Sequence, residues 1–88
     1  MKFKDYFPRG EILGTHERVT VFAVGGFACG EYKFDENDDD AWQNRAYPDD
    51  DEAEEDHYLE NYFPDVSKDE LAAAYAAIDL DGYRPYRI

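Results

Sequence analysis

The sequence predicts a single α+β domain over residues 1–88, in which a small antiparallel sheet built on a β-hairpin at residues 17–34 is packed by two or three short helices. Three observations favour this class: a β-branched run that turns at a glycine pair, a helix-start pattern before an alanine-rich run, and an acidic stretch between them that retains apolar side chains. A chain of 88 residues buries only about 60% of the surface that its unfolded form exposes, so we expect a small core.

The hairpin at residues 17–34 is predicted by local sequence alone. Its first half is rich in β-branched residues, and the following Gly-Gly pair supplies the positive φ angles of a type I′ turn. A register that pairs Val24 with Phe27 places Phe22 opposite Cys29. The turn therefore fixes which residues face each other.

Two further extended segments are expected. An isolated hairpin is marginally stable in water, so a short strand around residues 11–13, ended by Gly14, is predicted as a third member of the sheet. Residues 83–88 cannot continue a helix because Pro85 lacks a backbone N–H. We expect them to form an edge strand or an extended tail.

A helix is predicted to start at Ser67. Ser67 and Glu70 form a capping box, in which each side chain satisfies a backbone N–H of the first turn. The apolar residues that follow at helical spacing are Leu71, Tyr75 and Ile78. We expect the helix to end near Asp79, with Gly82 as a left-handed terminator.

Negative charge is concentrated in residues 35–60. Thirteen of these 26 residues are Asp or Glu and one is Arg, so the segment carries −12 of the net charge of −13. Selection for solubility or for high salt would spread acids over the whole surface. We therefore expect one anionic patch on a near-neutral domain.

The acidic segment is predicted to be helical across residues 35–63. Asp38 can cap a short helix that Pro48 stops, and Asp49 or Asp50 can cap a second helix that runs to Tyr62. The aromatic residues of the segment are expected to anchor these helices, and those left exposed to contact a partner.

The second acidic helix would carry charge at nearly the density of DNA. Residues 49–60 would span roughly 17 Å and present about one carboxylate per 2 Å, whereas duplex DNA carries one charge per about 1.7 Å. Carboxylates can thus stand in for phosphates. The residues predicted to contact the partner are Asp38, Asp39, Asp40, Trp42, Asp49, Asp50, Asp51, Glu52, Glu54, Glu55, Asp56, Tyr58 and Glu60.

Composition excludes several classes of protein. The net charge of −13 repels nucleic acid and anionic lipids, so direct binding to nucleic acid or membrane is not expected. A hydrophobic fraction of 43% is too high for a disordered acidic tail. The start of the chain lacks the apolar run of a signal peptide, and the single cysteine favours a reducing compartment. We expect a soluble, cytoplasmic monomer or homodimer.

No catalytic residue, cofactor or metal site is predicted. Acid/base catalysis needs two carboxylates in different environments within a cleft, unlike a cluster of exposed acids. Asp35, Asn37 and Asp39 match the first positions of a calcium-binding loop, but Asp40 stands where that loop requires glycine. Cys29, which has no second cysteine nearby, is expected in the core.

Runs such as residues 38–40 and 49–56 in a small, aromatic-containing chain resemble the phage-encoded DNA mimics, among them anti-CRISPR and anti-restriction inhibitors. The resemblance covers size and charge pattern, mainly over residues 35–60. It implies a non-enzymatic inhibitor, acting in the host cytoplasm, that occupies the Lys/Arg-lined DNA- or RNA-binding surface of a bacterial defence complex.

Two other hypotheses remain open at this point. An immunity protein or antitoxin that neutralises a basic nuclease toxin relies on nearly the same charge complementarity. A calcium-stabilised binding module would differ from both, because calcium would raise its melting temperature beyond the effect of plain salt.

Overall fold

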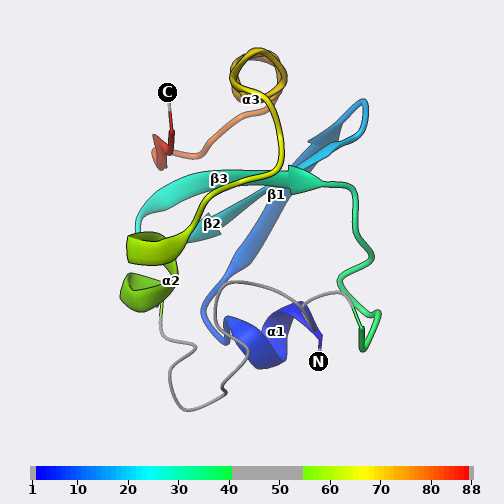
Figure 1. Ribbon diagram of the computed structural model, residues 1–88, viewed down its shortest axis with the longest axis vertical. Coiled ribbons are helices and arrows are strands. Elements are labelled where there is room, and N and C mark those ends of the chain that lie inside the picture. Colours follow the sequence, from blue (N-terminus) through cyan, green and yellow to red (C-terminus); the bar gives the residue numbers. More distant parts are fainter. Residues whose placement is uncertain (1, 41–54, 88) are drawn as a thin grey trace.

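The computed structural model describes residues 2–40 and 55–87, with the side chains of residues 55–57 excepted. It contains a four-stranded sheet in the order β1–β2–β3–β4, packed by three short helices (Figure 1). The α+β class predicted from the sequence is confirmed. The elements are α1 (Phe3–Tyr6), β1 (Glu11–His16), β2 (Val19–Val24), β3 (Phe27–Tyr32), α2 (Glu55–Asn61), α3 (Lys68–Ala77) and β4 (Arg84–Pro85).

The predicted hairpin is formed by β2 and β3. These strands are antiparallel, with Val24 opposite Phe27 and Phe22 opposite Cys29, as the sequence predicted. Gly25 and Gly26 have φ angles of 60° and 90°, which are the values a type I′ turn requires. The turn and the register therefore follow from local sequence.

The third strand, β1, is longer than predicted. It was expected to end at Gly14 but continues to His16, and the pairing with β2 shifts between Ile12 and Gly14. Leu13 is the extra residue at this irregularity, and Gly14 pairs with Val21, so the strand continues through the glycine instead of ending there. A Cβ atom at Gly14 would lie 3.2 Å from Cγ2 of Ile78, so the glycine also makes room for that side chain.

Helix α3 begins at the predicted residue, but only half of the predicted capping box forms, because the Glu70 carboxylate accepts a hydrogen bond from Ser67 Oγ instead of from the Ser67 N–H. The helix also ends in a different way than predicted. The hydroxyl of Ser67 accepts a hydrogen bond from the backbone N–H of Glu70 at 3.3 Å. At the other end Ile78 is already extended, with φ −112° and ψ 139°, so Gly82 does not terminate the helix. Gly82, with φ of 87°, instead shapes a separate turn closed by a hydrogen bond from Tyr83 N–H to Leu80 O.

The segment after this turn forms the edge strand β4. It pairs with β3 in parallel, through hydrogen bonds from the N–H groups of Arg84 and Tyr86 to the carbonyls of Gly26 and Ala28. The sheet is therefore mixed, whereas the sequence predicted an antiparallel one. Parallel pairing is possible because α3 carries the chain back across the sheet.

Both faces of the sheet are covered, which makes three layers (Figure 1). Helices α1 and α2 cover one face with an aromatic cluster, and α3 covers the other with a mainly aliphatic cluster. The aromatic cluster comprises Phe3, Tyr6, Phe7, Phe22, Val24, Cys29, Tyr58 and Tyr62. The aliphatic side comprises Val19, Val21, Ala28, Val66, Leu71, Ala74 and Tyr75. Strand β2 is buried along its whole length as a result.

The first helix was not predicted, because a single turn of four residues leaves little pattern in a sequence. The predicted helix starting near Asp38 falls mainly on residues 41–54, outside the described residues. The second predicted helix runs to Tyr62, and helix α2 ends one residue earlier, at Asn61. None of the described helices has the length and apolar character needed to cross a bilayer.

Candidate functional site

Residues 35–40, which we call the acidic turn, are exposed and contain five carboxylates. Two of these carboxylates shape the backbone. Oδ1 of Asp35 accepts a hydrogen bond from the N–H of Asn37, and Oδ1 of Asp38 accepts one from the N–H of Asp40, each at 2.9 Å.

The other three carboxylates of the acidic turn belong to Glu36, Asp39 and Asp40. Their side chains make no hydrogen bond to any residue of the described ranges 2–40 and 55–87. A folding role accounts for the first pair of acids but not for these three. They are available to a partner.

An open groove of about 520 Å³ runs beside the acidic turn. Ile12 and Phe34 form its apolar part. Both side chains are partly buried and pack against the aromatic cluster. The described residues that line it are Ile12, Thr15, Thr20, Lys33, Phe34, Asp35, Glu36 and Asn37. An apolar wall next to carboxylates fits the aliphatic stem and charged head of an arginine or lysine side chain.

Most of the predicted partner-binding residues are not covered by the structure. Asp38, Asp39 and Asp40 lie in the acidic turn, and Glu60 is exposed on α2. The residues outside the described side chains are Trp42, Asp49, Asp50, Asp51, Glu52, Glu54, Glu55 and Asp56. The acidic turn and α2 lie on opposite sides of the domain (Figure 1), so the described acids form two groups, not one stripe.

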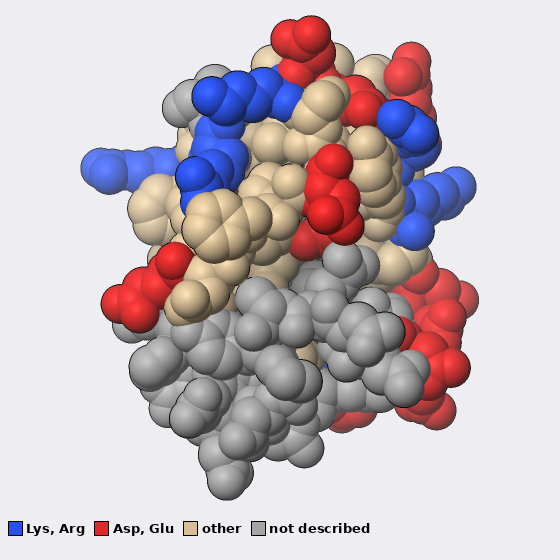
Figure 2. Space-filling view, in the orientation of Figure 1, with Lys and Arg blue, Asp and Glu red and all other residues tan. Residues whose placement is uncertain are grey.

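Figure 2 shows where charged side chains gather on one face of the molecule. The largest group of acidic side chains lies at the lower right, where Figure 1 places residues 35–40. Lysine and arginine side chains lie mainly in the half of the domain that carries α3 and the C-terminal strand, where other acidic side chains lie among them. The group at the lower right therefore differs from the rest of this face in containing one sign of charge.

The prediction that Tyr58 is an exposed anchor is wrong. Its side chain has no exposed surface and packs on Phe7 and Tyr62, with ring centres 4.8 and 4.7 Å away. Its hydroxyl donates a hydrogen bond to Oε1 of Glu31 at 3.2 Å. Burial raises the pKa of Tyr58, so the phenol stays protonated and remains a donor. Tyr58 holds α2 against the sheet.

The burial of Glu31 was not predicted from the sequence. This carboxylate is 3% exposed in the middle of the domain, although glutamate is rarely buried without partners. Residues two apart in a strand share a face, so Glu31 lies on the same side of β3 as the core residue Cys29. The alternation of faces along β3 could therefore have predicted the burial of Glu31. A buried carboxylate needs donors, and Tyr58 provides one.

Cys29 is a core residue, as predicted. It is fully buried, and desolvation together with the nearby Glu31 raises the pKa of its thiol. A thiol in this environment is a poor nucleophile at neutral pH. Within residues 2–40 and 55–87, no three His, Cys, Asp or Glu side chains come together in a way that could hold a metal ion.

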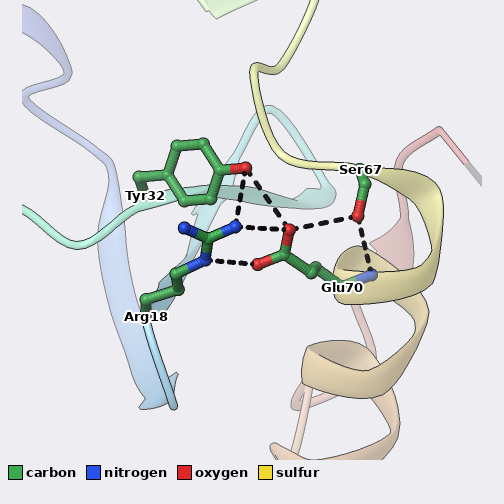
Figure 3. A network of polar contacts seen from close by, with 4 residues as sticks. All are labelled: Arg18, Tyr32, Ser67 and Glu70. Atoms are coloured by element: carbon green, nitrogen blue, oxygen red, sulfur yellow. Dashed lines mark hydrogen bonds and ion pairs between the residues drawn. The ribbon is translucent and has the colours of Figure 1, made fainter.

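A polar network links the first turn of α3 to the β1–β2 turn and to the end of β3 (Figure 3). Arg18, in the β1–β2 turn, contacts Glu70 through Nε and Nη2 at 2.7 and 3.0 Å. Its guanidinium lies 4.6 Å from the ring centre of Tyr32, whose hydroxyl donates to Glu70 at 3.3 Å. The hydrogen bond from Arg18 lowers the pKa of Glu70, so the pair is ionised at neutral pH.

The exposed aromatic side chain of the described residues is Phe63, with 72% of its surface accessible. The aromatic residues of the acidic segment, Phe63 among them, were predicted to anchor its helices, and the exposure of Phe63 contradicts this prediction. Helix α2 ends at Asn61, so Phe63 lies beyond the helix and is released from its packed face.

No model of a protein family matches the chain, and no match was found among curated proteins or solved structures. The function is therefore inferred from the site itself.

Proposed function

We propose that this protein is an acidic nucleic-acid mimic that binds the Lys/Arg-lined DNA- or RNA-binding surface of a bacterial defence complex, such as a CRISPR effector or a restriction enzyme. The observation that carries the proposal is the acidic turn, in which three exposed carboxylates make no hydrogen bond within the described residues. It acts by occupying the surface in the host cytoplasm and catalyses no reaction.

The arrangement of charge supports a specific partner over simple solubility. Residues 35–60 hold −12 of the net charge of −13, and crowding like charges destabilises a compact protein. The groove beside the acidic turn adds apolar contact area, which a purely solvated face would not need. A basic side chain can insert its stem against Ile12 and Phe34 while its charge meets Glu36.

Binding of this kind has a recognisable signature. Complementary charge accelerates association at low salt, and screening slows it as salt rises, because the Debye length falls from about 10 Å at 0.1 M to about 3 Å at 1 M. Nucleic acid competes for the same surface, so occupation by the protein and by DNA or RNA is mutually exclusive.

The test compares two variants that change net charge equally. In the first, Glu36, Asp39 and Asp40 are each replaced by lysine. In the matched control, three exposed acids elsewhere, Glu11, Glu17 and Asp65, are replaced by lysine. The wild type and both variants are immobilised and exposed to bacterial lysate, and the captured proteins are identified by mass spectrometry. Duplex DNA, guide-loaded RNA and sodium chloride are then used as eluents.

We expect the wild type and the control to retain a nucleic-acid-binding complex that DNA or RNA releases, and the first variant to lose it. Equal retention by all three proteins would contradict the proposal, as would a partner that nucleic acid does not displace. Capture of a single nuclease in place of a multi-subunit complex would favour the immunity-protein hypothesis.

A further inference from the structure

A small apolar pocket lies where the chain enters α3, and it shares no lining residue with the groove beside the acidic turn. Its volume is about 190 Å³. Val66 and Leu71, which are 4% and 1% exposed, form its apolar interior. The described residues that line it are Phe63, Pro64, Val66, Lys68, Leu71 and Arg87. Sites for cofactors and drug-sized ligands measure about 300–1,000 Å³, so this pocket fits a single side chain.

Phe63 forms an exposed wall of the pocket. A single exposed apolar side chain is ordinary on a protein surface and implies nothing alone. Phe63 differs because the guanidinium carbon of Arg87 lies 4.7 Å from its ring centre. The wall therefore combines an aromatic ring with a fixed positive charge, which is a combination enriched at binding hot spots.

Arg87 is held in place before any partner arrives. Its guanidinium lies over the rings of Phe63 and Tyr86, and its Nη2 donates a hydrogen bond to the carbonyl of Tyr62 at 3.1 Å. Its remaining N–H groups contact no acceptor within the described residues. A pre-ordered guanidinium loses little entropy on binding a carboxylate, and it can donate two parallel hydrogen bonds to one.

The charge at the pocket is opposite to that of the chain as a whole. Lys68 and Arg87 line it, and among the described residues no carboxylate does, even though Asp65 and Asp69 are close in sequence. Lys68 is also the first residue of the ten-residue α3, whose backbone dipole adds positive potential there. An occupant with negative charge is therefore favoured.

We propose that this pocket binds an acidic peptide segment of another protein, with one apolar side chain seated on Val66 and Leu71 and the flanking carboxylates on Arg87 and Lys68. A free phosphate would leave the apolar interior empty. The acidic turn of a second copy would do the same, because residues 35–40 contain only Asp, Glu and Asn. The inference is independent of the proposed function, since it uses a different surface.

The experiment titrates ¹⁵N-labelled protein with three peptides and follows the backbone amide signals. The probes are Glu-Glu-Leu-Glu-Glu, the same peptide with glycine in place of leucine, and Lys-Lys-Leu-Lys-Lys. The protein variants are Phe63→Ala, Arg87→Gln and the control Lys2→Gln, which removes one positive charge elsewhere on the surface. Phe63 is largely exposed, so the alanine variant retains its fold, which circular dichroism verifies.

We expect the acidic leucine peptide to shift the amides of Val66, Leu71 and Arg87. The Kd should rise about tenfold in the Phe63 and Arg87 variants and for the glycine peptide, and stay within about twofold in the Lys2 variant. Equal binding of the glycine or the lysine peptide would overturn the proposal, and so would equal effects of Arg87→Gln and Lys2→Gln. Self-association by sedimentation that Phe63→Ala abolishes would overturn it in favour of a second copy.

Discussion

Gly30, in the middle of β3, faces the side chain of Leu71 from α3. A Cβ atom at this position would lie 2.5 Å from Cδ2 of Leu71 and 3.3 Å from Cγ1 of Val19. Leu71 is 1% exposed, so it cannot swing into solvent to make room. We therefore expect Gly30→Ala to lower the free energy of unfolding by about 1–3 kcal/mol, the usual cost of overpacking a core.

Urea denaturation followed by circular dichroism measures this change. The same loss lowers the melting temperature by about 4–8 °C per kcal/mol in a domain of this size. Leu71→Ala alone should cost about 2–5 kcal/mol because it leaves a cavity.

In the double variant the new methyl at residue 30 occupies part of that cavity, so the total should fall short of the sum by about 1 kcal/mol or more. Strict additivity of Gly30→Ala and Leu71→Ala would refute the close packing of α3 on β3. A Gly30→Ala variant as stable as the wild type would refute it as well.

Two further predictions concern the core beneath α2. Tyr58→Phe keeps the ring but removes a donor to the buried Glu31, so the free energy of unfolding should fall by about 1–3 kcal/mol in urea denaturation; unchanged stability would show that the hydroxyl contributes nothing. Cys29 is buried and its thiol pKa is raised, so at pH 8 less of it is thiolate than in a free cysteine. A thiol reagent should therefore label Cys29 only as fast as the protein unfolds, and labelling at the rate of the urea-unfolded chain would contradict its burial.

The parts of the fold that depend on neighbouring residues were predictable from sequence. The glycine pair and the β-branched run define the hairpin and its register, and the Ser67–Glu70 pattern defines the start of α3. The parallel pairing of β4 with β3 was not predictable, because it joins residues far apart in the chain and depends on how α3 crosses the sheet.

Exposure was harder to predict than secondary structure. Tyr58 was predicted to be exposed because acidic residues surround it in the sequence. Its spacing of four from Tyr62, however, places both tyrosines on one helix face. Both are buried, and both pack over Glu31 and Cys29. The exposure of Phe63 depends on where α2 ends, which is the least certain feature of any helix read from sequence.

The order of the layers along the chain has a consequence for biosynthesis. Strands β1, β2 and β3 are complete by Tyr32, but the helix that covers one face of them begins only at Lys68. At a translation rate of roughly 5–20 residues per second, that apolar face waits on the order of seconds for its cover. The segment made in that interval includes the acid-rich residues 35–60. The nascent chain therefore gains most of its negative charge during the interval in which this face of the sheet lacks its cover.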